Sequence, residues 1–89
     1  MKITILNGKR MTSKKATHEY IKRKLEFPDY YGENLDALWD ILTTISEPLV
    51  IVLLNSELIY SNLEEYGRSL VSVFTEAMEE NPNIELRII

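Results

Sequence analysis

The sequence predicts an α/β fold, a small three-stranded parallel sheet packed with about four helices, on three observations. Residues 49–54 are consecutive apolar residues, the pattern of a parallel strand that is central or covered on both faces. Residues 83–89 alternate between apolar and polar, which is typical of a half-buried strand. Helical patterns separate the strands, and this alternation implies right-handed parallel crossovers.

The N-terminal part of the chain predicts a strand followed by a helix. Residues 2–7 are rich in β-branched residues and end at a turn pair, Asn7-Gly8. Ser13 is a suitable N-cap for the helix, which ends before Pro28 because the residue ahead of a proline avoids helical geometry. We expect four residues on its inward face: Ala16, Tyr20, Ile21 and Leu25.

A turn and a second helix are expected over residues 28–44, with the helix opening near Asn34. Leucines at 35, 38 and 42, with Ile41 beside them, form a face that packs inward. The opposite face is acidic and is flanked by aromatic residues, so we expect it to look outward. This outward face carries Glu33, Asp36 and Asp40, with Trp39 on its border and Tyr30 and Tyr31 just upstream.

The C-terminal part predicts two more helices and the last strand. Ser56 is expected to cap a short helix over residues 57–62, and residues 63–80 form the longest helix. Asn81-Pro82 ends that helix, and the strand of residues 83–89 follows. The inward face of the long helix is expected to hold Tyr66, Leu70, Val73, Phe74, Ala77 and Met78.

Size and composition indicate one folded domain over residues 1–89. The chain has 89 residues, enough for a single core, and 45% of them are hydrophobic. It has no cysteine, which excludes disulfides and thiolate metal sites. The apolar stretch at residues 3–6 is too short for a signal peptide, and nothing approaches a membrane span. We therefore expect a cytoplasmic protein with no membrane contact.

Charge is distributed unevenly along the chain. The net charge is −4, but residues 1–24 carry +7 and residues 25–67 carry −9 without a single Lys or Arg. Asp36 and Asp40 are four residues apart, and like charges at that helical spacing destabilise a helix by about 0.2–0.5 kcal/mol. Folding alone does not require such a pair. Exposed aromatic residues beside unpaired acids are typical of a binding surface, here for a positively charged partner.

Signals for catalysis are weak, and we expect no catalytic residue, cofactor or bound metal. The three glycines are isolated, so no phosphate-binding loop is present, and His18 has no candidate nucleophile near it in sequence. We expect His18 to lie on the surface or at a helix cap. Two other functions stay open: a metal-assisted hydrolase centred on Glu33, Asp36 and Asp40, and a nucleic-acid module that uses Lys14, Lys15, Lys22, Arg23 and Lys24.

Residues 28–40 resemble the motif of the barstar family, intracellular inhibitors of small secreted ribonucleases such as barnase. These residues read Pro-Asp-Tyr-Tyr-Gly-Glu-Asn-Leu-Asp-Ala-Leu-Trp-Asp. The resemblance continues more weakly through residues 5–8, 48–50 and 73–77, so it spans the chain. It implies a three-stranded parallel sheet with helices and a protein that is an inhibitor and not an enzyme.

The resemblance also implies a role for individual residues. Asp40 would enter the ribonuclease active site in the place of a substrate phosphate. Asp36 and Glu76 would pair with arginines at its rim, and Tyr30 would stack on the catalytic histidine. Further contacts would come from Gly32, Asn34, Leu35, Trp39 and Thr43.

The implied partner is a small basic ribonuclease, bound one-to-one by a chain that is a monomer when free and that contacts no nucleic acid directly. An alternative in the same class is an immunity protein that uses this acidic face against a different nuclease toxin.

Overall fold

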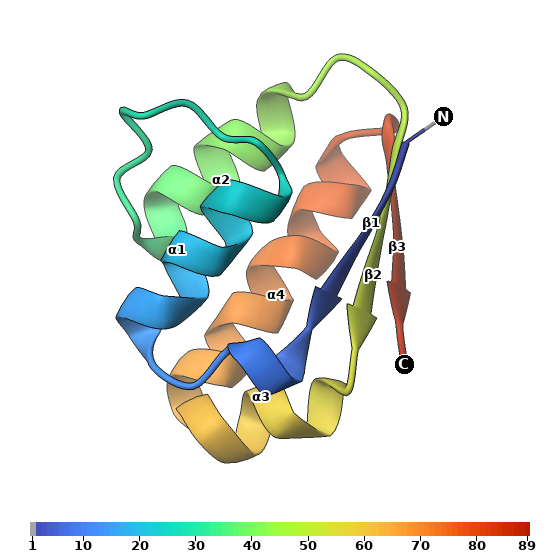
Figure 1. Ribbon diagram of the computed structural model, residues 1–89. Helices are drawn as coiled ribbons and strands as arrows, with labels where there is room; N and C mark the ends of the chain where they lie inside the picture. Colours follow the sequence, from blue (N-terminus) through green and yellow to red (C-terminus); the bar gives the residue numbers. More distant parts are fainter. Residues whose placement is uncertain (1) are drawn as a thin grey trace.

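The computed structural model describes residues 2–89 and confirms the predicted fold class. A three-stranded parallel sheet in the order β1-β2-β3 packs against α-helices (Figure 1). The elements are β1 (Lys2–Asn7), the 3-10 helix η1 (Gly8–Arg10), α1 (Lys14–Lys24), α2 (Leu35–Thr44), β2 (Leu49–Leu54), α3 (Ser56–Leu63), α4 (Glu65–Glu80) and β3 (Ile84–Ile88).

The apolar strand β2 is central, as predicted, and all of its residues are buried or half-buried, although the helices cover only one face of the sheet. Helices α1, α2 and α4 lie on one face of the sheet, and α3 lies at one end (Figure 1). Both crossovers run in the same direction along the sheet, so their right-handedness brings both sets of helices to one side. The other face carries Ile3 and Ile5, which are 65% and 47% exposed.

The core forms between the sheet and the helices. Leu38 and Leu42 of α2 and Leu70 of α4 are fully buried, as are Ile51 and Leu53 of β2. Each such side chain contributes about 1.5–3 kcal/mol through its removal from water. The acidic face of α2 is therefore mounted on a helix whose opposite side is held by the core.

One of the two predicted helix caps is confirmed. The Ser13 hydroxyl accepts a hydrogen bond from Ala16 N–H at 3.1 Å, as expected. The predicted cap at Ser56 is wrong, because α3 starts there and Asn55 precedes it in the left-handed region at φ 55°. Asparagine tolerates that conformation, and the Asn55 amide donates to Asn7 Oδ1 instead of capping the helix.

The long helix begins two residues later than predicted, after a sharp break at Glu64, whose φ is 55° and ψ is −126°. The break lets α4 fold back closely on α3. A Cβ on Gly67 would lie 2.5 Å from the Ile59 carbonyl oxygen, so the close approach requires glycine there. Val71 is buried although the sequence pattern did not include it in the inward face.

No helix within residues 2–89 is long and apolar enough to cross a membrane.

Candidate functional site

The segment before α2 is ordered by local hydrogen bonds that set where the helix starts. Tyr31 N–H donates to the Pro28 carbonyl at 3.0 Å, which closes a turn. The Asn34 side-chain oxygen accepts from Ala37 N–H at 2.8 Å, so Asn34 is the N-cap, which agrees with the predicted start of the helix near this residue. Its amide nitrogen donates back to the Gly32 carbonyl at 3.3 Å. Asn34 therefore ties the turn to the first turn of α2.

The outward face of α2 carries carboxylates without cationic partners. Asp36 and Asp40 are exposed, and neither forms an ion pair within residues 2–89. Trp39 and Thr43 lie half-buried beside them, and the Thr43 hydroxyl donates to the Trp39 carbonyl at 2.8 Å. Asp36 lies in the first helical turn, where the helix dipole favours a negative charge, whereas Asp40 lies a turn deeper.

Packing of α4 against α2 adds a third carboxylate to this surface. A shallow groove of about 290 Å³ is lined by α2 residues and by Val73 and Glu76 of α4. Asp36 and Glu76, forty positions apart in sequence, therefore line one groove. The α2 residues that line it are Leu35, Asp36 and Trp39. The other predicted contact residues lie outside this groove, on the preceding turn or farther along α2: Tyr30, Gly32, Asn34, Asp40 and Thr43.

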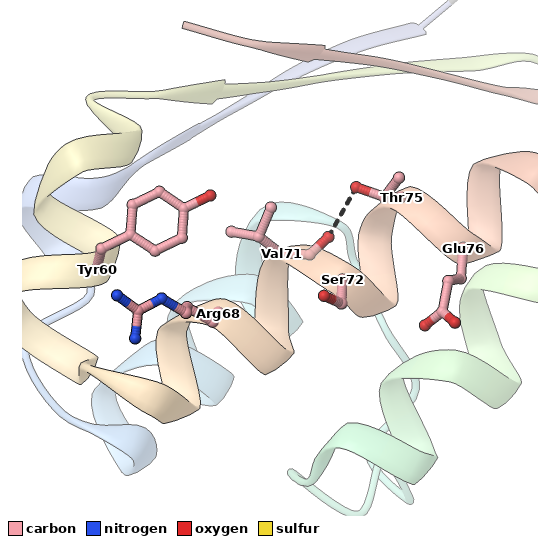
Figure 2. A pocket seen from close by; sticks show the side chains of 6 residues that line it. All are labelled: Tyr60, Arg68, Val71, Ser72, Thr75 and Glu76. Carbon is pink, nitrogen blue, oxygen red and sulfur yellow. Dashed lines mark hydrogen bonds between the residues drawn. The ribbon is translucent and has the colours of Figure 1, made fainter.

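A second groove, of about 580 Å³, adjoins the first at Glu76 and is lined by residues of α4 and by Tyr60 of α3 (Figure 2). Glu76 stands at its end and points toward α2, whereas Thr75 lies nearer the sheet and donates to the Val71 carbonyl at 3.0 Å. Arg68 also lines this groove and pairs with Glu65. Glu76 borders both grooves, while the α2 acids Asp36 and Asp40 do not line the second.

The two adjacent tyrosines of the turn point in opposite directions. Tyr30 is 84% exposed, as predicted, but Tyr31 is only 4% exposed, so the expectation that it looks outward is wrong. Tyr31 packs edge-on against Phe27, with ring centroids 5.0 Å apart. Its burial anchors the turn, and the anchored turn presents Tyr30 to solvent.

His18 is buried, and the prediction of a surface or capping role is wrong. It is 1% exposed, and both ring nitrogens have hydroxyl partners. The Tyr31 hydroxyl lies 2.7 Å from Nδ1, and the Tyr66 hydroxyl lies 2.6 Å from Nε2. This Tyr31–His18–Tyr66 triad connects the turn, α1 and α4 inside the protein. The sequence indicates the burial of His18 through its spacing from Ile21 and Leu25, which places the histidine on the inward face of α1.

Burial sets the ionisation of the triad. It lowers the pKa of His18, and the Glu33 carboxylate partly offsets the effect. It also raises the pKa of Tyr31, with further contributions from Tyr66 and Glu33, and raises the pKa of Tyr66. All three groups are therefore neutral at neutral pH, and one imidazole nitrogen donates while the other accepts.

We expect the stability of the protein to fall as the pH drops below about 6.5, the usual pKa of histidine. Because His18 has a lowered pKa only when folded, the unfolded chain binds the proton more readily. The contribution of neutral His18 to the free energy of unfolding is fully present above about pH 6.5, and it is lost as the pH falls through the lower pKa of the folded state. The free energy of unfolding falls by no more than about 1.4 kcal/mol per pH unit in this range. Urea unfolding between about pH 7 and pH 5.5 measures this slope.

His18→Gln provides the control, because the chain has one histidine and glutamine keeps the capacity to donate and accept. We expect the variant to be less stable at neutral pH but almost insensitive to pH over this range. Equal slopes in the parent and the variant would show that His18 is not the titrating group.

Two features of the structure weaken the other two functions considered for this chain, a nucleic-acid module and a metal-assisted hydrolase. The basic residues of α1 are partly used in internal contacts: Lys14 Nζ lies 4.7 Å from the centre of the Tyr66 ring, and the Arg23 guanidinium lies 5.7 Å from that of Tyr20. Within residues 2–89, no group of three or more acidic or histidine side chains is arranged to hold a metal ion.

Comparison with known proteins relates this chain to one family. The sequence model of the family described as Barstar (barnase inhibitor) matches residues 1–89. A Bacillus subtilis (strain 168) protein with the name "Putative ribonuclease inhibitor YrdF" is 43% identical over 81 residues. That match covers 90% of this chain and 89% of the relative. The chain belongs to the barstar family.

Proposed function

We propose that this chain inhibits a small basic ribonuclease of the barnase type by binding it one-to-one across its active site. The observation that carries the proposal is the surface formed by α2 and α4, where Asp36 and Glu76 line one groove and Asp40 lies one helical turn away. None of these carboxylates has a cationic partner within residues 2–89. The family match and the name of the Bacillus relative support the same function.

Asp40 is the residue that we assign to the ribonuclease active site. A nuclease site is a preorganised set of donors for a phosphate, and a fixed carboxylate satisfies those donors without presenting a bond that can be cleaved. Asp36 and Glu76 then pair with arginines at the rim, where charged groups contribute most to orientation and rate of encounter.

The aromatic and polar residues around the acids complete the proposed contact. Tyr30 is almost fully exposed, although its backbone is held by the buried Tyr31 next to it. A large exposed ring on an anchored turn is suited to stack on a histidine, because little conformational entropy is lost on binding. The remaining contacts are assigned to Gly32, Asn34, Leu35, Trp39 and Thr43.

Such an inhibitor acts in the cytoplasm, where it protects the producing cell from its own enzyme. The direct test is RNA cleavage by barnase, titrated with this chain. We expect cleavage to fall linearly to zero at one equivalent when the enzyme concentration exceeds the Kd. Undiminished cleavage with the inhibitor in large excess would exclude barnase as a target, and a nuclease toxin of another fold would become the better candidate.

Association with the ribonuclease is expected to slow by at least about tenfold as salt rises from roughly 0.01 M to 0.5 M, because salt screens steering between opposite charges. The barnase–barstar pair is itself the reference case for such steering, so the effect is extended here to a relative. Stopped-flow mixing measures the association rate, and we expect the dissociation rate to change less.

The double variant Asp36→Asn/Glu76→Gln should associate more slowly at low salt and depend less on salt. Glu57→Gln is the matched control, since Glu57 is an exposed acid on α3 that lines neither groove. An association rate that is indifferent to salt in the parent would contradict steering by this surface.

A further inference from the structure

The outer edge of β3 carries backbone groups that pair with no other strand within residues 2–89. β3 is an edge strand of the sheet. Leu49 N–H donates to the Asn83 carbonyl at 2.8 Å, and Ile89 N–H donates to the Leu53 carbonyl at 2.9 Å, so the odd-numbered residues of this segment bond to β2. Since alternate residues of a strand direct their backbone groups to opposite edges, the even-numbered residues direct theirs outward.

Three outward residues define what this edge offers. Ile84 N–H is already used, because it donates to the Asn81 carbonyl at 3.1 Å in the turn before the strand. The Ile84 carbonyl and both backbone groups of Leu86 and Ile88 remain. Exposed edges of this kind are templates for pairing with another strand, and natural proteins usually obstruct them.

The charge pattern of β3 is complementary to itself. The strand reads Ile84-Glu85-Leu86-Arg87-Ile88, with one acid and one base placed symmetrically about Leu86. We propose that β3 pairs antiparallel with β3 of a second copy of this chain, about a two-fold axis at Leu86. Glu85 of each copy then lies opposite Arg87 of the other.

The backbone register agrees with this charge pairing. With Leu86 on the axis, Leu86 N–H of each copy donates to the Leu86 carbonyl of the other, and Ile88 N–H donates to the Ile84 carbonyl. All the outward groups of the edge are then bonded except the Ile88 carbonyl, whose partner would be the Ile84 N–H that is already used. Glu85 and Arg87 fall on the non-hydrogen-bonded pairs, where opposite side chains are closest.

The charges of Glu85 and Arg87 are available for this exchange. In the single chain the Arg87 guanidinium donates to Glu85 Oε2 within the same strand, with Nε at 2.9 Å. The Glu85 side chain is 53% exposed and the Arg87 side chain is 65% exposed. Pairing between copies replaces this local contact with two cross-strand pairs and also covers Ile88 and Ile89 in part.

The other edge of the sheet lacks this property. The only charged residue of β1 is Lys2, which pairs with Glu26 at 2.8 Å. No two-fold axis within β1 sets an acid opposite a base. The complementarity is therefore specific to β3 and is not a general feature of this sheet.

The paired form leaves the α2 surface free. β3 and α2 lie in different layers of the molecule (Figure 1), so a chain paired through β3 still presents Asp36 and Asp40. A few backbone bonds and two charge pairs make a small interface, so the dimer is weak and forms as concentration rises. At low concentration the chain is the monomer expected from its sequence.

Sedimentation equilibrium of the intact chain up to roughly 1 mM tests the proposal. We expect a monomer–dimer equilibrium in the parent. Glu85→Arg sets two arginines opposite two arginines, and Arg87→Glu does the same with glutamates, so each single variant should dimerise at least about tenfold more weakly. An equimolar mixture of the two variants should recover the association, because each supplies the charges that the other lacks.

Three results would overturn the proposal: a parent that stays monomeric over the whole range, dimerisation that persists in both single variants, or a mixture that fails to recover it. The second result would assign self-association to another surface, and the third would exclude this register. Ribonuclease binding by both variants should match that of the parent, so failure here is separate from failure of the proposed function.

Discussion

Replacing Asp40 with alanine should weaken binding to a barnase-type ribonuclease by at least about 2 kcal/mol, or about 30-fold in Kd. In the proposed complex Asp40 is surrounded by donors that normally hold a phosphate. Removing it leaves those donors desolvated and without an acceptor, which costs more than the loss of a contact at the rim. Isothermal titration calorimetry or competitive inhibition measures the change.

The same substitution should leave the free protein as stable as before, or slightly more stable. Asp40 is exposed and lies four residues from Asp36, so alanine relieves a repulsion of about 0.2–0.5 kcal/mol and has a higher helix propensity. Affinity and stability should thus change in opposite directions. Glu57→Ala removes the same charge from α3 and should change affinity only slightly. If Asp40→Ala inhibits as well as the parent, the phosphate-mimic role is excluded.

Replacing Asn81 with alanine should lower the free energy of unfolding by about 2–4 kcal/mol, because three hydrogen bonds of a buried side chain are lost. The Leu42 carbonyl loses this donor, and the Ile45 carbonyl keeps only the Asn83 amide. Asn83 N–H loses its acceptor, the Asn81 side-chain oxygen at 3.0 Å. Asn81 is buried, and its amide nitrogen donates to the carbonyls of Leu42 and Ile45, both at 2.9 Å. These bonds join the end of α4 to the end of α2. Urea unfolding by circular dichroism measures the loss.

Two further variants separate this hydrogen bonding from helix termination. Asn81→Asp keeps the size and the turn-forming character of asparagine but replaces the donating nitrogen with an acceptor, so it should be at least as destabilising as alanine. Asn83→Ala removes one bond to Ile45 at 3.1 Å, from a half-buried residue, and should cost less. Equal, small losses in all three variants would contradict the buried role of Asn81.

The elements that could be predicted from sequence are those set by local chemistry. Ser13 and Asn34 cap helices through their own side chains, within three residues of the groups that they bond. The apolar run of residues 49–54 identifies a central strand without reference to its neighbours. The run could not show that the helices cover only one face of the sheet, because that depends on the side to which both crossovers turn.

The features that could not be predicted depend on contacts between distant residues. The partners of His18 are Tyr31, thirteen positions away, and Tyr66, forty-eight positions away. The lysines around His18 on α1 suggest an exposed residue, whereas its spacing from Ile21 and Leu25 places it on the inward face of the helix. Asn81 was identified as a helix stop, but its bonds to α2 span more than thirty positions.

The candidate site also combines features that local sequence sets with features that depend on contacts between distant residues. The acidic face of α2 follows from residue spacing alone, because Asp36 and Asp40 lie on the side opposite Leu38 and Leu42. The position of Glu76 beside Asp36 follows from the packing of α4 on α2, which no local pattern specifies. The assignment of Asp40 to a phosphate position rests on family resemblance and on the chemistry of a nuclease site.

Competition with a mononucleotide tests most directly whether this chain occupies the phosphate site of a ribonuclease. The Kd of the complex between the chain and barnase would be measured at increasing concentrations of a mononucleotide that binds the active site. We predict that the apparent Kd rises in proportion to the nucleotide concentration, because the nucleotide phosphate and the Asp40 carboxylate compete for the same donors. An unchanged Kd, with nucleotide and chain bound together, would show that Asp40 does not occupy the phosphate site.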